Sequence, residues 1–553
     1  MMTGSERAII LVSPTAALDA RPRLFAALEA AFPIRFRGVG SDARDAVGLI
    51  TVGPEGTMPP ADRLMLTLPT FAVAGGPPGS TTREEFTLHR VDGVDRRLHG
   101  ITLSDHFTAP QFGDVPGGRG NEDVLATTGS EAVWTVSRGP VPVHHVRSTL
   151  PELRADEVLY ALLTKRQLSA VAVVQFLREA SGTYDLHAAP LRASYLFDDP
   201  NLRWRSYGFI DYEHLVRHAD EHGYHAAMAM IPLDAGWPHR PTADLFRRRP
   251  DRLSLIVHGN DHTKAELLAT HDDHTAQSIA AQAVRRIRRF ERRCGLSVDR
   301  VMAPPHGLCS MSMTRALGSV GFDALTAIHP LPWTERPPAE PFLAGWRPGD
   351  FVGGCAVIPR IPLGSSAADL GLRAFLDHPL VVYGHHDDLA DGLDALAETA
   401  ATINRLGEVR WTSVGEIVAG NFEQRLDGDH LTVRPFARGI RLPIDPEVAT
   451  LTIEHPGDSV DDGSLLGFSI GAAASRLAFG VRLPLPEHGR KVLQIRLRGA
   501  NDVDPDLVLA PAWRPWPKLR RVVTEIRDRA SARPGSGLST PISTTSAAGG
   551  SAT

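Results

Sequence analysis

Three apolar segments of this sequence each end in residues that can bind a metal or transfer a proton. They are residues 194–201 (SYLFDDPN), 253–262 (LSLIVHGNDH) and 379–388 (PLVVYGHHDD). A short apolar run that leads into polar residues is typical of a buried strand and the loop that follows it. In barrels of alternating strands and helices the chemistry lies at the carboxyl ends of the strands. The sequence therefore predicts one site built from three strand ends.

The chemistry that these residues favour is metal-assisted hydrolysis. His258 and His262 lie four positions apart, which puts two imidazoles on one face of a helix, one turn apart. A catalytic zinc-type site also needs a third ligand and an open position for water, and the pair Asp198–Asp199 offers a carboxylate. In a chain with 23 histidines such a His pair is expected about once by chance. The prediction therefore rests on the combination of strand ends rather than on the spacing.

Alternation of strands and helices from residue 185 to 422 predicts how these strand ends are positioned. A helix at 209–222 separates the first segment from a strand at 224–231, and the long helix 275–294 has one apolar face. Seven or eight such units with right-handed crossovers favour a closed or nearly closed (β/α) barrel. The expected fold class is α/β.

The regions on either side of the barrel have different patterns. Residues 1–150 alternate strands (8–13, 34–37, 46–52, 70–74) with a helix at 21–31, which favours a small α/β domain with a parallel sheet. Residues 151–184 form a helical connector, and residues 423–500 predict a small antiparallel β module. Gly38 and Gly40 follow the second strand rather than the first, so we expect no dinucleotide site.

Residues 501–553 combine a basic and aromatic segment with a tail of low complexity. In residues 513–521 (WRPWPKLRR), ordinary packing of the tryptophans is the favoured interpretation, and a weak contact with a membrane or a partner is the alternative. Residues 531–553 are rich in Ser, Thr, Gly, Pro and Ala, so we expect them to be disordered and dispensable.

Composition and charge argue against several classes of protein. A chain of 553 residues, 42% hydrophobic, can bury several cores. A net charge of −5 argues against a nucleic-acid partner. The three cysteines (Cys294, Cys309, Cys355) form neither a disulfide framework nor a CxxC pair. No apolar run reaches the roughly 18 residues of a transmembrane segment, and no signal peptide is evident, so we expect a cytoplasmic protein.

The order Phe-Asp-Asp, His-x-x-x-His, a Pro-Pro loop and a final strand ending in His resembles the polysaccharide deacetylase family, which includes chitin, peptidoglycan and nodulation-factor deacetylases (carbohydrate esterase family 4). The resemblance covers about residues 190–420. It implies a distorted (β/α)7–8 barrel and a divalent metal, usually zinc. The implied metal ligands are Asp199, His258 and His262, the implied general base is Asp198, and the implied general acid is His385 or His386.

The sequence departs from the family pattern at several positions, as expected of a divergent member. Gly259 follows the first histidine, where the family usually has Ser or Thr. Ala303 stands where the family has an arginine that orients the base, and Arg300 is out of register. His225 and His306 are candidate substrate contacts, although a structural role is favoured for each.

The leading hypothesis is a metal-dependent hydrolase that removes an acetyl group from an N-acetylated sugar or another N-acetylated small molecule. Between His385 and His386, the sequence favours His385 as the acid because it comes directly after the strand. A second hypothesis keeps the metal but assigns another non-peptide C–N bond. A third is a non-catalytic, sugar-binding scaffold in polysaccharide assembly, which the missing arginine would explain.

Overall fold

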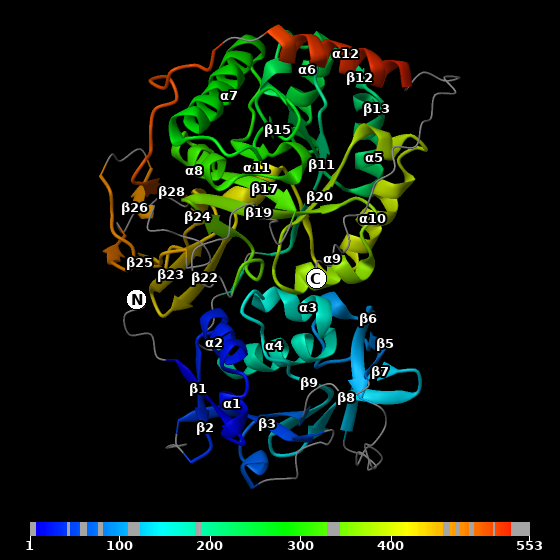
Figure 1. Cartoon of the computed structure of the whole chain (residues 1–553), viewed down its shortest axis with the longest axis vertical. Coiled ribbons are helices and arrows are strands. Elements are labelled where there is room, and N and C mark those ends of the chain that lie inside the picture. Colours follow the sequence, from blue (N-terminus) through cyan, green and yellow to red (C-terminus); the bar gives the residue numbers. More distant parts are fainter. Residues whose placement is uncertain are drawn as a thin grey trace, which may run out of the picture.

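The computed structural model of the chain describes residues 7–531 apart from short internal segments, and has the N-terminal domain and the barrel at opposite ends of its long axis (Figure 1). The internal segments outside the description are 41–44, 56–62, 76–80, 109–121, 183–186, 189, 329–342, 457–464, 472–474, 486–491 and 513–514. The C-terminal β strands lie beside the barrel (Figure 1).

A closed barrel of seven parallel strands confirms the expected fold class. The ring closes where β11 pairs with β14 on one side and with β20 on the other. The strands are β11 (Arg192–Asp198), β14 (Ala226–Met230), β15 (Leu253–His258), β16 (Val301–Ala303), β17 (Ala324–Ile328), β19 (Cys355–Pro362) and β20 (Leu380–Gly384). The short strand β21 (Arg410–Trp411) pairs with β11 outside the ring, and β18 (Asp350–Val352) runs antiparallel to β19.

Helices pack on the outward side chains of the barrel strands. The longest, α7, begins after Asp272, whose carboxylate accepts the N–H of Thr275, and ends at Gly295, where φ is 65°. Its apolar face includes Ala283, Ile287 and Phe290, as the sequence predicts. These helices are α5 (Tyr212–His222), α6 (Arg240–Arg248), α7 (Asp273–Cys294), α8 (Met311–Ser319), α9 (Ala367–Phe375) and α10 (Asp394–Asn404). Helix α11 (Val414–Ala419) instead packs with the inward side chains of the strands.

Alternation along the strands decides which side chains reach the interior of the barrel. Leu196, Ile256 and Ile358 belong to one buried core, which continues into α11 and the C-terminal strands. Side chains two positions further along a strand share the same face. Two positions after Leu196, Ile256 and Ile358, these strands carry Asp198, His258 and Arg360. The same alternation that builds the core therefore puts three polar side chains in the last layer of the barrel.

The N-terminal domain contains a nine-stranded sheet in the order β2-β1-β3-β4-β9-β8-β7-β5-β6. The four strands that the sequence predicts (β1 to β4) pair in parallel, as expected, and β9 joins them in parallel. The remaining pairings, which involve strands that the sequence analysis did not predict, are antiparallel. The strands are β1 (Ala8–Ser13), β2 (Ile34–Gly38), β3 (Ala46–Glu55), β4 (Thr70–Gly75), β5 (Thr81–Leu88), β6 (Thr102–Thr108), β7 (Glu122–Thr128), β8 (Glu131–Arg138) and β9 (Pro142–Thr149).

Helices join this domain to the barrel. Helix α4 (Gln167–Ser181), in the expected connector, is buried in the core of the N-terminal domain together with α2 (Pro22–Ala31). At the junction, Arg178 and Arg97 both contact Asp377, which follows α9. The remaining short helices of this half are α1 (Ala16–Asp19) and α3 (Leu162–Lys165).

The strands that follow the barrel form two small sheets, β10-β22-β23-β25-β27 and β24-β28-β26, and the first of these also includes β10 from the segment before the barrel. All their pairings are antiparallel except β23 with β25, which is parallel and differs from the expected module. The strands are β10 (His187–Ala188), β22 (Phe422–Asp427), β23 (His430–Pro435), β24 (Gly439–Pro443), β25 (Thr450–Ile453), β26 (Leu465–Ile470), β27 (Arg482–Pro484) and β28 (Val492–Gly499).

The chain then returns to the barrel and ends its described part in helix α12 (Pro515–Ser531), which lies across the top of the barrel (Figure 1). The hairpin β12 (Ser206–Tyr207) and β13 (Ile210–Asp211) lies at the same end. The expected disordered tail falls almost entirely on residues 532–553, outside the described residues. Among the described helices, none combines the length and apolar character that crossing a bilayer requires.

Candidate metal centre at the carboxyl end of the barrel

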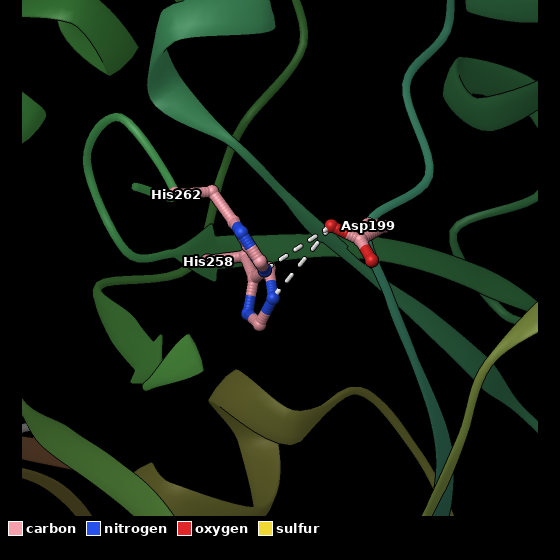
Figure 2. Close-up of side chains that lie close together, drawn as sticks. All are labelled: Asp199, His258 and His262. Carbon is pink, nitrogen blue, oxygen red and sulfur yellow. Dashed lines mark ion pairs between the residues drawn. The ribbon is translucent and has the colours of Figure 1, made fainter. Parts of the chain in front are cut away.

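The structure brings Asp199, His258 and His262 together, with one ligand atom from each within 4.8 Å of the others. Asp199 Oδ1 lies 3.9 Å from His258 Nε2 and 3.5 Å from His262 Nε2 (Figure 2). The residues come from the ends of β11 and β15, two strands that flank β14 in the barrel. One carboxylate and two imidazoles are a donor set that suits zinc and related divalent metals.

The orientation of His258 leaves its Nε2 atom available. Its Nδ1 lies 2.9 Å from the carbonyl oxygen of Ala303, and a carbonyl can only accept a hydrogen bond, so Nδ1 carries the hydrogen. The lone pair of Nε2 then faces Asp199. Metal-binding histidines are commonly held in this way by a backbone carbonyl. Ala303, where the resembled family has an arginine, thus contributes through its main chain.

His262 is held by the loop that precedes it rather than by a helix. The carboxylate of Glu266 accepts the N–H groups of Asn260, Asp261 and His262. At Gly259 φ is 58°, and a β-carbon there would approach a Glu266 oxygen to 2.5 Å. Only glycine fits this left-handed, crowded position, which explains physically why Ser or Thr is absent. Sequence reasoning missed Glu266.

The local electrostatics favour the protonation states that a metal ligand needs. Burial, reinforced by His258, lowers the pKa of His262 to about 4, so its imidazole is neutral near pH 7. Burial by itself would raise the pKa of Asp199, but His258, His262 and Arg521 bring it down to about 2. In addition, His262 Nδ1 is buried without a hydrogen-bond partner in the described structure. The three residues therefore fit a divalent cation.

Backbone strain gathers at the same place. Asp199, His262 and His306 have φ values of 80°, 51° and 59°, in the left-handed region that non-glycine residues rarely adopt. Such conformations cost about 1–3 kcal/mol each and tend to occur at functional sites. At Asp199 the turn follows the end of β11 directly and brings its carboxylate over the barrel beside the histidines.

Asp198 is buried, and a buried arginine contacts it. Arg360 Nη1 donates to both carboxylate oxygens, at 3.1 and 2.9 Å, and its guanidinium lies 4.3 Å from the centre of the Tyr383 ring. Arg300, which the sequence places near the motif, instead pairs with Glu291. Sequence reasoning missed Arg360, although a lone charged residue within the buried run CAVIPRIP of β19 was an available signal.

The two candidate acids lie in different surroundings. His385 is exposed at the end of β20 and is close enough to Asp199 to influence its carboxylate. His386 is buried against Tyr207 and Phe209, with Nε2 3.8 Å from Asp528. The two side chains thus lie in different surroundings, and His385 is the one that contributes to the lowered pKa of Asp199.

The two histidines proposed as substrate contacts also differ. The ring of His306, which is exposed, lies 5.9 Å from that of His262, at the edge of the site. His225 is fully buried, with Nδ1 3.1 Å from the hydroxyl of Ser194, at the opposite end of β14. His225 therefore belongs to the barrel core and has no access to substrate.

Helix α12 covers this end of the barrel. Arg521 is buried, and its Nε lies 2.8 Å from Asp234 while its Nη1 lies 3.5 Å from Asp199. Arg520 donates to the carbonyl of His262. The interpretation that the tryptophans of 513–521 pack in a core is wrong for Trp516, which is 64% exposed; Trp513 lies outside the described residues.

Comparisons with known proteins give a partial likeness. No family model and no curated protein matches the sequence. A solved structure described as a polysaccharide deacetylase from Mycobacterium smegmatis is similar over 42% of this chain and 93% of its own, at 14% identity and a TM-score of 0.29. A T48 deacetylase solved with substrate is similar over the same shares, at 12% identity and a TM-score of 0.26. Such low scores leave the function to be inferred from the site itself.

Proposed function

We propose that the chain is a metal-dependent hydrolase that removes an acetyl group from an N-acetylated sugar or glycoconjugate. The observation that carries the proposal is a buried Asp198–Arg360 pair directly beside the cluster of Asp199, His258 and His262. A carboxylate kept next to a metal site but outside the ligand set is the arrangement that hydrolysis of an amide needs.

The residues divide into holding, proton-accepting and proton-donating groups. Asp199, His258 and His262 would hold a divalent metal, preferably zinc, which when bound polarises an amide carbonyl and makes water easier to deprotonate. Asp198, fixed by Arg360, would accept the proton of the attacking water. His385, exposed at the rim, would protonate the departing amine, which is a poor leaving group as an anion.

Two observations bear on the alternatives. The absence of the motif arginine is the sequence feature that supports a non-catalytic scaffold. Arg360, however, supplies a guanidinium to Asp198 from another strand. Helix α12 lies over the site, with Arg521 against Asp199, which favours a small N-acetylated sugar or the end of a glycoconjugate over the middle of a polymer. Hydrolysis of another non-peptide C–N bond uses the same residues and differs only in the substrate.

The decisive experiment pairs metal analysis with acetate release from N-acetyl monosaccharides, nucleotide-linked sugars and chitin oligomers. Asp199→Asn and His262→Asn should lose the metal. Asp198→Asn should keep it and lose activity by about 10²–10⁴-fold. A matched control is His222→Asn, because His218 and His222 are also four apart, with rings 4.3 Å from each other, yet belong to no three-residue ligand cluster among the described residues. Wild-type protein without metal and without acetate release would refute the proposal.

A further inference from the structure

Helix α12 has its charged face toward the protein and its apolar face toward solvent. Arg521, Glu525 and Asp528, which lie four and three residues apart, are buried. The large apolar side chains point outward, with exposures of 64% for Trp516, 56% for Leu519, 42% for Val522, 60% for Val523 and 63% for Ile526. A surface helix normally buries its apolar stripe, so this orientation leaves a contiguous apolar face without a described partner.

Specific contacts fix this orientation. Arg521 pairs with Asp234, as described above. Glu525 accepts a hydrogen bond from Arg203 at 2.9 Å, and Asp528 accepts one from the hydroxyl of Tyr207 at 3.0 Å. Rotating the helix to bury its apolar face would break these buried polar contacts, each of which is costly to leave unpaired. The apolar face is therefore held outward by the barrel itself.

The exposed or half-buried charged side chains of α12 itself are all basic. The two acidic residues of α12, Glu525 and Asp528, are both buried, whereas Lys518, Arg520, Arg527 and Arg529 are exposed or half-buried. Trp204, which is 52% exposed, extends the apolar surface beyond Arg529, whose guanidinium lies 4.3 Å from the centre of its ring. Tryptophan and basic residues around an apolar stripe are the composition of helices that lie in a membrane interface.

We propose that α12 docks on the surface of an anionic lipid bilayer, with Trp516, Leu519, Val523 and Ile526 inserted at the level of the headgroups. A second copy of the chain fits the surface less well, because two such helices packed face to face would oppose the same basic residues. Since α12 forms one end of the long axis (Figure 1), docking would hold the carboxyl end of the barrel against the membrane. This inference does not depend on the proposed catalytic function.

The test is co-sedimentation of the full chain with vesicles of phosphatidylcholine alone or with about 30% phosphatidylglycerol. We expect binding to the anionic vesicles that weakens with salt and with removal of phosphatidylglycerol. Leu519→Glu/Val523→Glu should lower the partition coefficient at least about tenfold, because two inserted apolar side chains become charged. The matched control is Leu426→Glu/Leu466→Glu, which changes two exposed leucines (53% and 43%) of the C-terminal sheets and should leave binding unchanged.

Folding of both double variants is checked by circular dichroism and thermal unfolding, since all four positions are exposed. The proposal is overturned if the wild-type chain binds neither vesicle. It is equally overturned if the α12 variant binds as well as wild type, or if the control pair loses as much. Wild-type dimers that the α12 variant converts to monomers, without vesicle binding, would assign the face to a second copy instead.

Discussion

Replacing Arg360 by Met should separate the role of the buried ion pair from that of the metal ligands. The side chains of Arg360 and Asp198 are 1% and 2% exposed, and Arg360 Nη1 contacts both carboxylate oxygens. Methionine keeps an unbranched apolar stem in the barrel but removes the charge. Asp198 then remains buried without the cation that holds both of its carboxylate oxygens.

The magnitude follows from the burial of both groups. Breaking a buried ion pair by removing one partner typically costs about 3–5 kcal/mol, because the other charge stays desolvated. Asp198→Asn alone should lower the free energy of unfolding by a similar amount, because it leaves the buried guanidinium of Arg360 without its partner. The double variant Arg360→Met/Asp198→Asn removes both charges and should recover most of the loss, so the double-mutant cycle should give a coupling energy of at least about 2 kcal/mol.

The assay combines denaturant unfolding, metal content and the rate of acetate release. We expect Arg360→Met to unfold at lower denaturant concentration, to keep its metal and to release acetate more slowly, because the carboxylate of Asp198 is no longer held in place. Arg300→Met is the control, because Arg300 pairs with Glu291 at 2.6 Å in a partly exposed position, and it should change stability by no more than about 1 kcal/mol. Equal effects of the two variants on stability, or an unchanged rate of acetate release for Arg360→Met, would refute the reasoning.

Three further predictions concern the supports of the site and the barrel core. Glu266→Ala frees three backbone N–H groups of the loop that carries His262, so metal affinity, measured by competition with a chelator, should fall about 10–100-fold. His385→Ala should depress turnover and flatten the basic limb of the pH–rate profile, whereas His386→Ala, which removes packing against Tyr207, should mainly lower the melting temperature; equal small losses would place the acid elsewhere. Burial lowers the pKa of His225 to about 4, below its ordinary value of about 6.5, so the unfolded chain binds more protons between these values. Stability should therefore fall by up to about 3 kcal/mol as the pH drops from 6.5 to 4, and unfolding curves of His225→Asn should lose that part of the dependence.

The barrel could be predicted from the sequence because its strands are buried on both faces. Strands such as β11 and β20 are nearly continuous apolar runs, and a run of this kind is visible without knowledge of its partners. Strand β5 (TTREEFTL) buries only Phe86 and Leu88 among its well-described side chains, and its antiparallel neighbours β6 and β7 are similarly mixed. The sequence therefore indicates the antiparallel half of the N-terminal sheet much less clearly than it indicates the barrel strands.

Part of the candidate site could be predicted from the sequence and part could not. Asp199, His258 and His262 could be proposed because each stands at or just beyond the end of an apolar strand. Arg360 could not be connected to Asp198, since the two residues are 162 positions apart and meet only after the barrel has closed. Glu266 was missed for another reason: its carboxylate accepts hydrogen bonds from backbone N–H groups, and a backbone donor leaves no trace in the identity of the residue that carries it.

Helix α12 shows why an apolar pattern alone does not say which face of a helix is buried. Arg521, Glu525 and Asp528 find Asp234, Arg203 and Tyr207 in segments that follow β11 and β14, about three hundred positions earlier in the chain. Rotating the helix would leave Asp234, which is 4% exposed, without Arg521, and breaking a buried ion pair costs about 3–5 kcal/mol. The observed orientation keeps the three polar contacts and leaves the apolar stripe of α12 exposed among the described residues. Docking on a lipid surface would cover this stripe, which is why vesicle binding, rather than thermal stability alone, is the measurement that this helix calls for.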